Sequence, residues 1–213
     1  MARLPALRLI WALLPACAGS DALAGAQQYE PLAASVRAAL HASVSDAAAP
    51  LLPIQDADER AQWLAEMSRR LQKRIPDPAY RTELLTSIHY EATRAGLDPQ
   101  MVLGLIQVES NFRKYAISGA GARGYMQVMP FWLQVMNQPD ANLFHLRTNL
   151  RYGCTILRHY LDIEKGDLFR ALGRYNGSLG KAEYPELVRG AWQHHWSWTP
   201  ARLASRAGQS TAN

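Results

Sequence analysis

The sequence has 213 residues, of which 48% are hydrophobic and 19% charged, with a formal net charge of +5. This composition allows one domain with a buried core, and it excludes a disordered chain, a collagen, a coiled coil and a porin. The mild basic excess suits an acidic polymer without identifying it. Two cysteines, Cys17 and Cys154, cannot build a disulfide framework or a cysteine-rich zinc module.

Residues 1–24 have the pattern of a secretory signal peptide. Basic residues flank the start of an apolar run that is too short for a permanent membrane helix, and Ala22-Leu23-Ala24 is a suitable cleavage sequence. We therefore expect an exported, periplasmic protein. Leu14-Pro15-Ala16-Cys17 resembles a lipoprotein box with an unfavourable proline, which leaves a lipid anchor at Cys17 open. Cys154 then remains as a lone thiol, which is expected to be buried.

The remaining chain divides into three parts. Residues 25–56 are rich in Ala, Ser and Pro and predict a flexible leader with a weak helical stretch near 31–40. Residues 57–198 show helical periodicity and no alternating strand pattern, so we expect a mainly α domain. The polar residues 199–213 predict a disordered tail. Helices are expected at 58–74, 80–95, 99–110, 130–136, 148–160, 167–174 and 183–193.

A glycine-rich segment at 119–124 satisfies the G-x-G-x-x-G pattern, but a helix precedes it and Pro130 follows closely. Nucleotide binding needs a preceding strand and a long following helix, so we interpret these glycines as residues of a tight turn close to a ligand. The histidines include no H-x-x-x-H pair. We therefore expect no metal, no cofactor and no nucleic-acid partner.

Glu109 is the candidate acid. In the helix that Asp98 caps and Pro99 begins, Glu109 follows the apolar stripe of Val102, Leu105 and Ile106 at helical spacing. Burial on this stripe would raise the pKa of the carboxyl, as a general acid requires. An ion pair with Arg113, four residues on, would lower it. Helix geometry alone leaves the two alternatives open.

The segments after Glu109 carry a resemblance. Glu109-Ser110 is followed by Ser118, Gly121-Ala122-Arg123-Gly124-Tyr125-Met126-Gln127-Val128-Met129-Pro130, Asn149, Gly153 and Tyr175-Asn176-Gly177. In this order and spacing, residues 97–189 resemble the catalytic domain of the family 1 (Slt-type) lytic transglycosylases. The resemblance implies a mainly α, goose-type-lysozyme-like domain with a substrate cleft. Tyr125 replaces the family's usual Leu, where it could add a sugar-stacking face, and Leu150 replaces the usual Ile.

The resemblance also implies a reaction on peptidoglycan glycan strands. Glu109 would protonate the oxygen between N-acetylmuramic acid and N-acetylglucosamine, with the muramyl acetamido group stabilising the developing charge. Ionised Glu109 would then take the proton of the C6 hydroxyl, which closes a 1,6-anhydro ring without water. No motif selects a second carboxylate among Asp140, Glu164 and Glu183.

Five further residues match family positions that imply contact with the sugar. Gln127 would hydrogen-bond to it, Ser118 would face the cleft, and Met126 would line the groove. Tyr175 would bring its hydroxyl to Glu109, with Asn176 beside it. Asn149 is instead interpreted as a side chain that ties the backbone together. The C-terminal tryptophans 192, 196 and 198 are interpreted as core.

Two alternatives remain open beside an exported lytic transglycosylase. A goose-type muramidase would use the same acid and consume water, and a non-catalytic peptidoglycan-binding module would keep only the groove. Residues 25–56 could additionally dock to a secretion or conjugation apparatus of the cell envelope. We expect a monomer.

Overall fold

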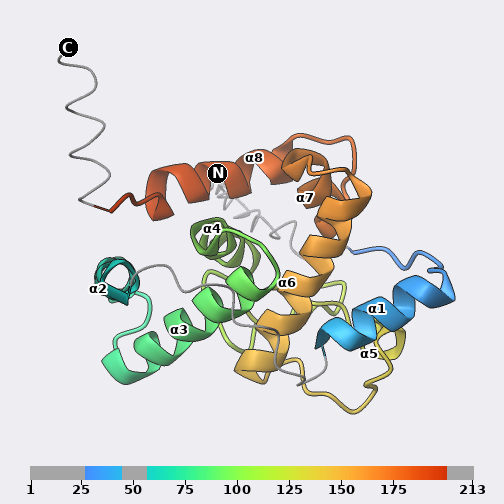
Figure 1. Ribbon diagram of the computed structural model, residues 1–213, viewed down its shortest axis with the longest axis horizontal. Helices are drawn as coiled ribbons and strands as arrows, with labels where there is room; N and C mark the ends of the chain where they lie inside the picture. The colour runs from blue at the N-terminus through green and yellow to red at the C-terminus, as the bar shows by residue number, and fades with distance from the viewer. Residues whose placement is uncertain (1–26, 45–56, 201–213) are drawn as a thin grey trace, which may run out of the picture.

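A computed structural model describes residues 27–44 and 57–200, and within them the fold is helical (Figure 1). The elements are α1 (Ala34–Val44), α2 (Ala57–Leu71), α3 (Pro78–Arg94), α4 (Pro99–Ser110), α5 (Phe131–Val135), α6 (Leu146–Ile163), α7 (Leu168–Asn176), α8 (Glu183–Ala191) and the π-helical turn η1 (Trp192–Trp196). The described part of the chain contains isolated β-bridges within 117–128 and no strand. The prediction of a mainly α domain is confirmed.

Helix α4 lies at the centre of the domain. It is apolar on most of its circumference, as expected of a helix surrounded by others. Helices α3 and α8 and the turn η1 pack around it (Figure 1). Gly104 allows the closest approach, because a Cβ there would lie 2.8 Å from the backbone nitrogen of Trp192. The C-terminal elements α8 and η1 therefore help to bury α4.

Local signals set the start of two helices. The side chain of Asp77 accepts hydrogen bonds from the first turn of α3, and Asp98 accepts one from Gln100 N at 2.6 Å at the start of α4. Proline occupies the first helical position in both. The other predicted helices are also present, with ends that differ by a few residues. Residues 192–193, predicted as the end of an α-helix, belong instead to the π-helical turn Trp192–Trp196.

The segment predicted as a flexible leader contributes to the packed body. Helix α1 packs against α6 and buries Leu40 and Val44. Upstream, Gln27 is buried and accepts a hydrogen bond from the Trp132 indole at 2.9 Å. The signal peptide, residue Cys17, residues 45–56 and most of the predicted tail lie outside the described residues, so the proposed boundaries stay predictions.

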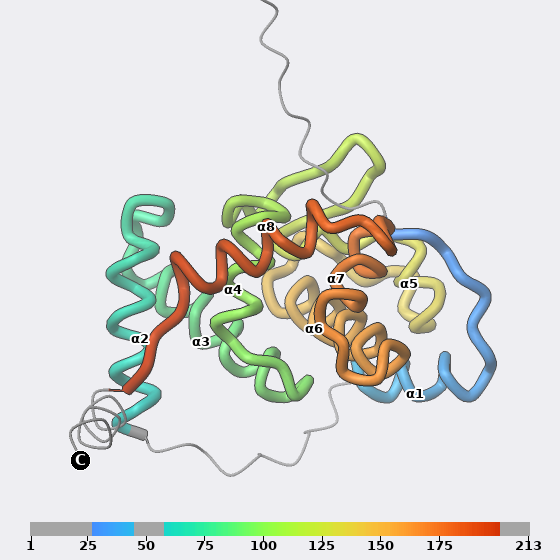
Figure 2. The backbone as a smooth tube through the Cα atoms, turned by 90° about the horizontal axis from the view of Figure 1, so that it is seen from above, coloured from blue at the N-terminus to red at the C-terminus, as the bar shows by residue number. Residues whose placement is uncertain are grey.

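The C-terminal segment closes the domain by returning to α2 (Figure 2). One guanidinium nitrogen of Arg70 donates to the carbonyl oxygens of His195 and Ser197, each at 3.0 Å. Trp196 is buried and donates to Gln107 at 2.9 Å, which agrees with its interpretation as core. None of the helices in the described ranges is long and apolar enough to cross a membrane.

Candidate functional site

Glu109 is buried at the C-terminal end of α4, where the residue is only 3% exposed. The hydroxyl of Tyr184, from α8, donates to Oε1. Oε2 is also buried and has no hydrogen-bond partner among the described residues. One carboxyl oxygen is therefore held while the other is unengaged.

Burial sets the protonation of this group. Loss of solvation raises the pKa of Glu109 to about 8, and the hydrogen bond from Tyr184 opposes the rise without overcoming it. The ion pair with Arg113 that the sequence left open is not formed, because Arg113 donates to the Ser110 carbonyl at 3.0 Å. At neutral pH the carboxyl keeps its proton, which is the state that a general acid needs.

The other acids considered from the sequence do not share this environment. The pKa of Glu164 lies below its ordinary value because Arg174 and Arg170 donate hydrogen bonds to it. Asp140 and Glu183 are exposed. Across the described parts of the chain, no group of three or more His, Cys, Asp or Glu side chains is arranged to hold a metal ion.

The chain leaves α4 through strained backbone. Asn111 and Phe112 have φ of 47° and 62°, and Gln127, in the glycine-rich segment, has φ of 47°. Asparagine tolerates this left-handed region, whereas Phe and Gln adopt it at a cost that the surrounding packing must offset. Strained backbone is common at functional sites. Here Asn111 and Phe112 follow Glu109 closely in the sequence, and Gln127 lies in the motif that comes after it.

A network of side-chain bonds to the backbone builds the glycine-rich segment. Asn149 accepts from Met126 N at 2.8 Å and donates to the carbonyls of Arg123 and Leu143, both at 2.8 Å, as its interpretation requires. Gly124, at φ 77°, allows this approach, since a Cβ there would lie 2.7 Å from the Leu143 oxygen. The segment is a packed turn, as its glycines indicated.

Gln127 and Ser118 both bond within this segment. Gln127 is 1% exposed, and its amide nitrogen donates to Gly124 O at 2.9 Å and Ala116 O at 3.1 Å. Ser118 is half-buried and its hydroxyl accepts from Ala122 N at 3.1 Å. Their contact with sugar stays a prediction, and the bonds seen here hold the shape of the turn.

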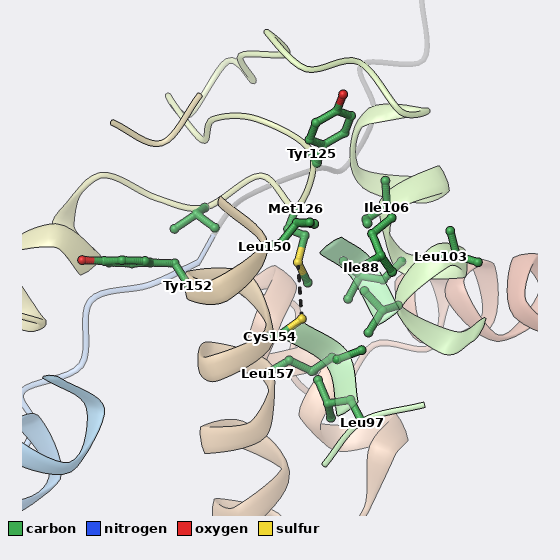
Figure 3. Close-up of a cluster of buried hydrophobic side chains, with 14 of the residues drawn as sticks. Ile88, Leu97, Leu103, Ile106, Tyr125, Met126, Leu150, Tyr152, Cys154 and Leu157 are labelled. Carbon is green, nitrogen blue, oxygen red and sulfur yellow. Dashed lines mark hydrogen bonds between the residues drawn. The ribbon is translucent and has the colours of Figure 1, made fainter. Parts of the chain in front are cut away.

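Met126 differs from its predicted place in a groove. Its side chain has no exposure and lies in the core, with Sδ 3.9 Å from Sγ of Cys154 (Figure 3). Cys154 is a free, buried thiol whose pKa is raised by burial, as expected of a lone cysteine. Met126 can pack in the core against α6 because Gly153 has no side chain to occupy the space that Met126 fills.

The resemblance implied that the Tyr175 hydroxyl would lie at Glu109, but Tyr175 does not donate to this carboxyl. Its buried hydroxyl donates to Met126 O at 2.7 Å, and Tyr184 takes the position at the carboxyl. Asn176 is 2% exposed and donates to Ser178 at 3.1 Å, while its Oδ1 is buried without a partner among the described residues. Tyr184 was not predicted from the sequence, because its only signal is an aromatic residue at the start of a helix far along the chain.

Tyr125 offers no sugar-stacking face. The ring is 1% exposed, and its hydroxyl lies 2.6 Å from the hydroxyl of Tyr80, in α3. Ser110, next to Glu109, donates to the Tyr125 carbonyl at 2.8 Å. The expectation of a stacking face is therefore wrong, since this departure from the family pattern connects the glycine-rich segment to α3 and α4.

Comparison with known proteins finds relatives of the part of the chain that contains this site. Residues 86–187 match the model of the family described as "Transglycosylase SLT domain". The chain is 35% identical over 88 residues to the "Transglycosylase" of Enterobacteria phage PRD1, which covers 41% of this chain and 32% of that protein. The "Membrane-bound lytic murein transglycosylase C" of Histophilus somni is 38% identical over 112 residues, covering 45% of this chain and 31% of the relative.

The chain therefore carries an Slt-type lytic transglycosylase domain, as the resemblance indicated. A shorter stretch of 46 residues is 50% identical to the "Membrane-bound lytic murein transglycosylase C" of Haemophilus influenzae, covering 22% of this chain and 13% of that protein. The chain spans about a third of the length of the first two relatives. No solved structure matches it significantly.

Proposed function

We propose that this protein is a peptidoglycan lytic transglycosylase in which Glu109 acts first as general acid and then as general base. The carboxyl of Glu109 carries the proposal: it is buried, has a pKa of about 8, and presents an oxygen without a partner among the described residues. The family match and the names of the relatives support murein as the substrate.

In the proposed reaction, Glu109 donates one proton to the glycosidic oxygen and later accepts one from the C6 hydroxyl of the sugar. Protonated Glu109 gives its proton to the oxygen between N-acetylmuramic acid and N-acetylglucosamine, and the bond from the muramyl C1 to that oxygen breaks. The acetamido oxygen of the same sugar stabilises the positive charge. The C6 oxygen then bonds to C1, and ionised Glu109 takes the C6 hydroxyl proton, so the acid is regenerated and no water is consumed.

This scheme explains how the site can work with Glu109 as the one catalytic carboxyl that the sequence motifs identify. Glycosidases ordinarily use two carboxyl groups, one as acid and one as nucleophile or base. Here the attacking group belongs to the sugar, and a well-oriented intramolecular nucleophile can contribute about 7–11 kcal/mol. Tyr184 fixes the carboxyl through Oε1, which leaves Oε2 without a partner among the described residues and available to carry the proton.

Mass spectrometry of products from purified murein tests the proposal. The wild type is expected to give fragments with 1,6-anhydromuramyl ends, and Glu109→Gln is expected to give none. A goose-type muramidase would instead give reducing ends, heavier by one water. Cleavage that continues unchanged in Glu109→Gln would contradict the role of the acid, and binding without cleavage in the wild type would indicate a binding module.

We propose export to the periplasm on the signal-peptide pattern of residues 1–24, with lipidation of Cys17 as an alternative way of processing this segment. The "membrane-bound" relatives support an envelope location. Attachment to a secretion or conjugation apparatus and the monomeric state stay predictions.

A further inference from the structure

A cavity of about 420 Å³ opens at the opposite end of α4 from Glu109. Its walls come from α2, the end of α3, the start of α4 and residues 198–200. Asp98, on its rim, precedes Glu109 by 11 positions, which is about 16 Å along a helix at 1.5 Å per residue. We call it the α2–α4 pocket. Its volume is that of a site for a small ligand.

The α2–α4 pocket combines residues of the matched family segment with residues outside it. Trp63 and its neighbours on α2, and Trp198 at the C-terminal end, lie before and after residues 86–187, whereas the lining residues from α3 and α4 lie within them. The matched segment alone therefore does not form the whole pocket.

Aromatic rings form the apolar part of this pocket. Trp63 and His89 meet edge to face with ring centroids 5.0 Å apart. Trp198 is half-buried, and its backbone nitrogen donates to Oε1 of Gln100 at 2.5 Å. The bonds from Arg70 to the carbonyls of residues 195 and 197 hold the same segment in place. The backbone that carries the Trp198 indole is therefore held in place before a ligand binds.

Polar groups of both kinds surround the rings. Among the described lining residues, Glu59 and Asp98 bring carboxylate acceptors and Arg60 brings a guanidinium donor. Burial and the nearby Arg60 lower the pKa of His89, so its ring is neutral and offers one donor and one acceptor. Two acidic side chains oppose an anionic ligand, whereas mixed donors and acceptors beside an indole suit a neutral ring rich in hydroxyl groups.

We propose that the α2–α4 pocket binds a neutral N-acetylhexosamine unit of a glycan, as a second contact with the polymer that is cleaved at Glu109. The identity of the polymer rests on the proposed function; the saccharide site itself does not. Two contacts with one polymer raise the effective concentration of glycan at the acid without any change in its chemistry. The pocket thus contributes to the binding of the polymer and not to its cleavage.

Binding of tri-N-acetylchitotriose to the full-length protein tests the site, with the ring protons of His89 and Trp198 followed by NMR. Glu109→Gln serves as the background, so that the saccharide stays intact. We expect saturable shifts at both rings. Trp198→Ala and Arg60→Ala should each weaken binding at His89 at least tenfold, while Phe169→Ala, which removes an exposed ring on α7, should leave it unchanged.

Arg60 is exposed, so its variant tests the pocket even if Trp198→Ala unfolds the segment. Absence of a saturable shift at His89 in Glu109→Gln, or unchanged affinity in Arg60→Ala and a folded Trp198→Ala, would overturn the proposal. Saturable binding at His89, together with a wild-type protein that does not cleave murein, would contradict the proposed function alone.

A kinetic split tests the consequence for the polymer. Arg60→Ala should raise KM for intact sacculi several-fold with kcat unchanged, and should leave the cleavage of a short soluble glycan fragment unaltered. Equal loss on both substrates would show that the variant acts on the catalytic site, which would contradict a separate capture site.

Discussion

Tyr184 reaches Glu109 from 75 residues further along the chain and donates its hydroxyl to Oε1 of the carboxyl. The two groups are buried together, and each is affected by the other: the hydrogen bond lowers the pKa of Glu109, and the nearby carboxyl helps to raise that of Tyr184. Burial is the larger influence on both. Burial in the core therefore keeps Glu109 protonated, and the hydrogen bond from the Tyr184 hydroxyl orients its carboxyl.

Tyr184→Phe should separate these two effects. Loss of the donor removes the influence that opposes burial, so the pKa of Glu109 should rise and the alkaline limb of kcat/KM should move to higher pH. The maximum rate should fall about tenfold, because a positioning hydrogen bond of about 1.4 kcal/mol is lost. The pH profile of murein cleavage measures both changes.

Tyr175→Phe is the matched control, because its hydroxyl donates to the Met126 carbonyl and not to the carboxyl. It should leave the alkaline limb in place. A shift in the Tyr175 variant with none in the Tyr184 variant would reverse the assignment of the two tyrosines.

Glu109 should also make stability depend on pH. Its pKa rises from 4.5 to about 8 on folding, so the folded state holds the proton more tightly than the unfolded state. The resulting stabilisation is fully present below about pH 4.5 and is lost as the pH rises to about 8, by an amount of the order of 5 kcal/mol. Urea unfolding of the wild type from pH 5 to 9 should show this decline, and Glu109→Gln should show a much flatter profile. Parallel profiles would contradict the buried acid.

The helices were predictable because their signals are local. Asp98 followed by Pro99 fixes the start of α4, and apolar spacing then places Glu109 on a buried stripe. The choice between burial and an ion pair was not local, because it depends on whether the Arg113 side chain turns to Glu109 or to the Ser110 carbonyl. Only the packed structure decides it.

The partners of the acid were beyond the sequence for a related reason. Tyr175 and Tyr184 both lie on short helices late in the chain, and no periodicity tells which hydroxyl meets the carboxyl. Gln27 shows the same limit: a polar residue in an Ala-rich segment gave no sign that it would enter the core beside Trp132. Long-range contacts of single side chains carry no pattern along the chain.

Gln27→Ala should destabilise the protein although it lies outside the matched family segment. The change leaves the Trp132 indole N–H without its acceptor and empties a buried position, for a loss of about 1–3 kcal/mol. Thermal unfolding measures it. Gln28→Ala, at the neighbouring exposed position, is the control and should change stability little. Equal stability of the two variants would contradict the docking of this segment.

Gly153→Ala should disturb the core under the glycine-rich segment, because a Cβ at this position would lie 2.7 Å from Cβ and 2.8 Å from Cε of Met126. A contact with an atom next to the backbone cannot be relieved by rotating the end of the side chain, so overpacking should cost about 2 kcal/mol. Gly190→Ala, in α8, is the matched helical control: nothing lies within 4 Å of the added Cβ, and alanine should stabilise that helix by about 0.5 kcal/mol. Urea unfolding should therefore give opposite signs for the two substitutions. The same sign for both would mean that Met126 is not held against α6, and that the core of Figure 3 does not support the segment that carries Gln127.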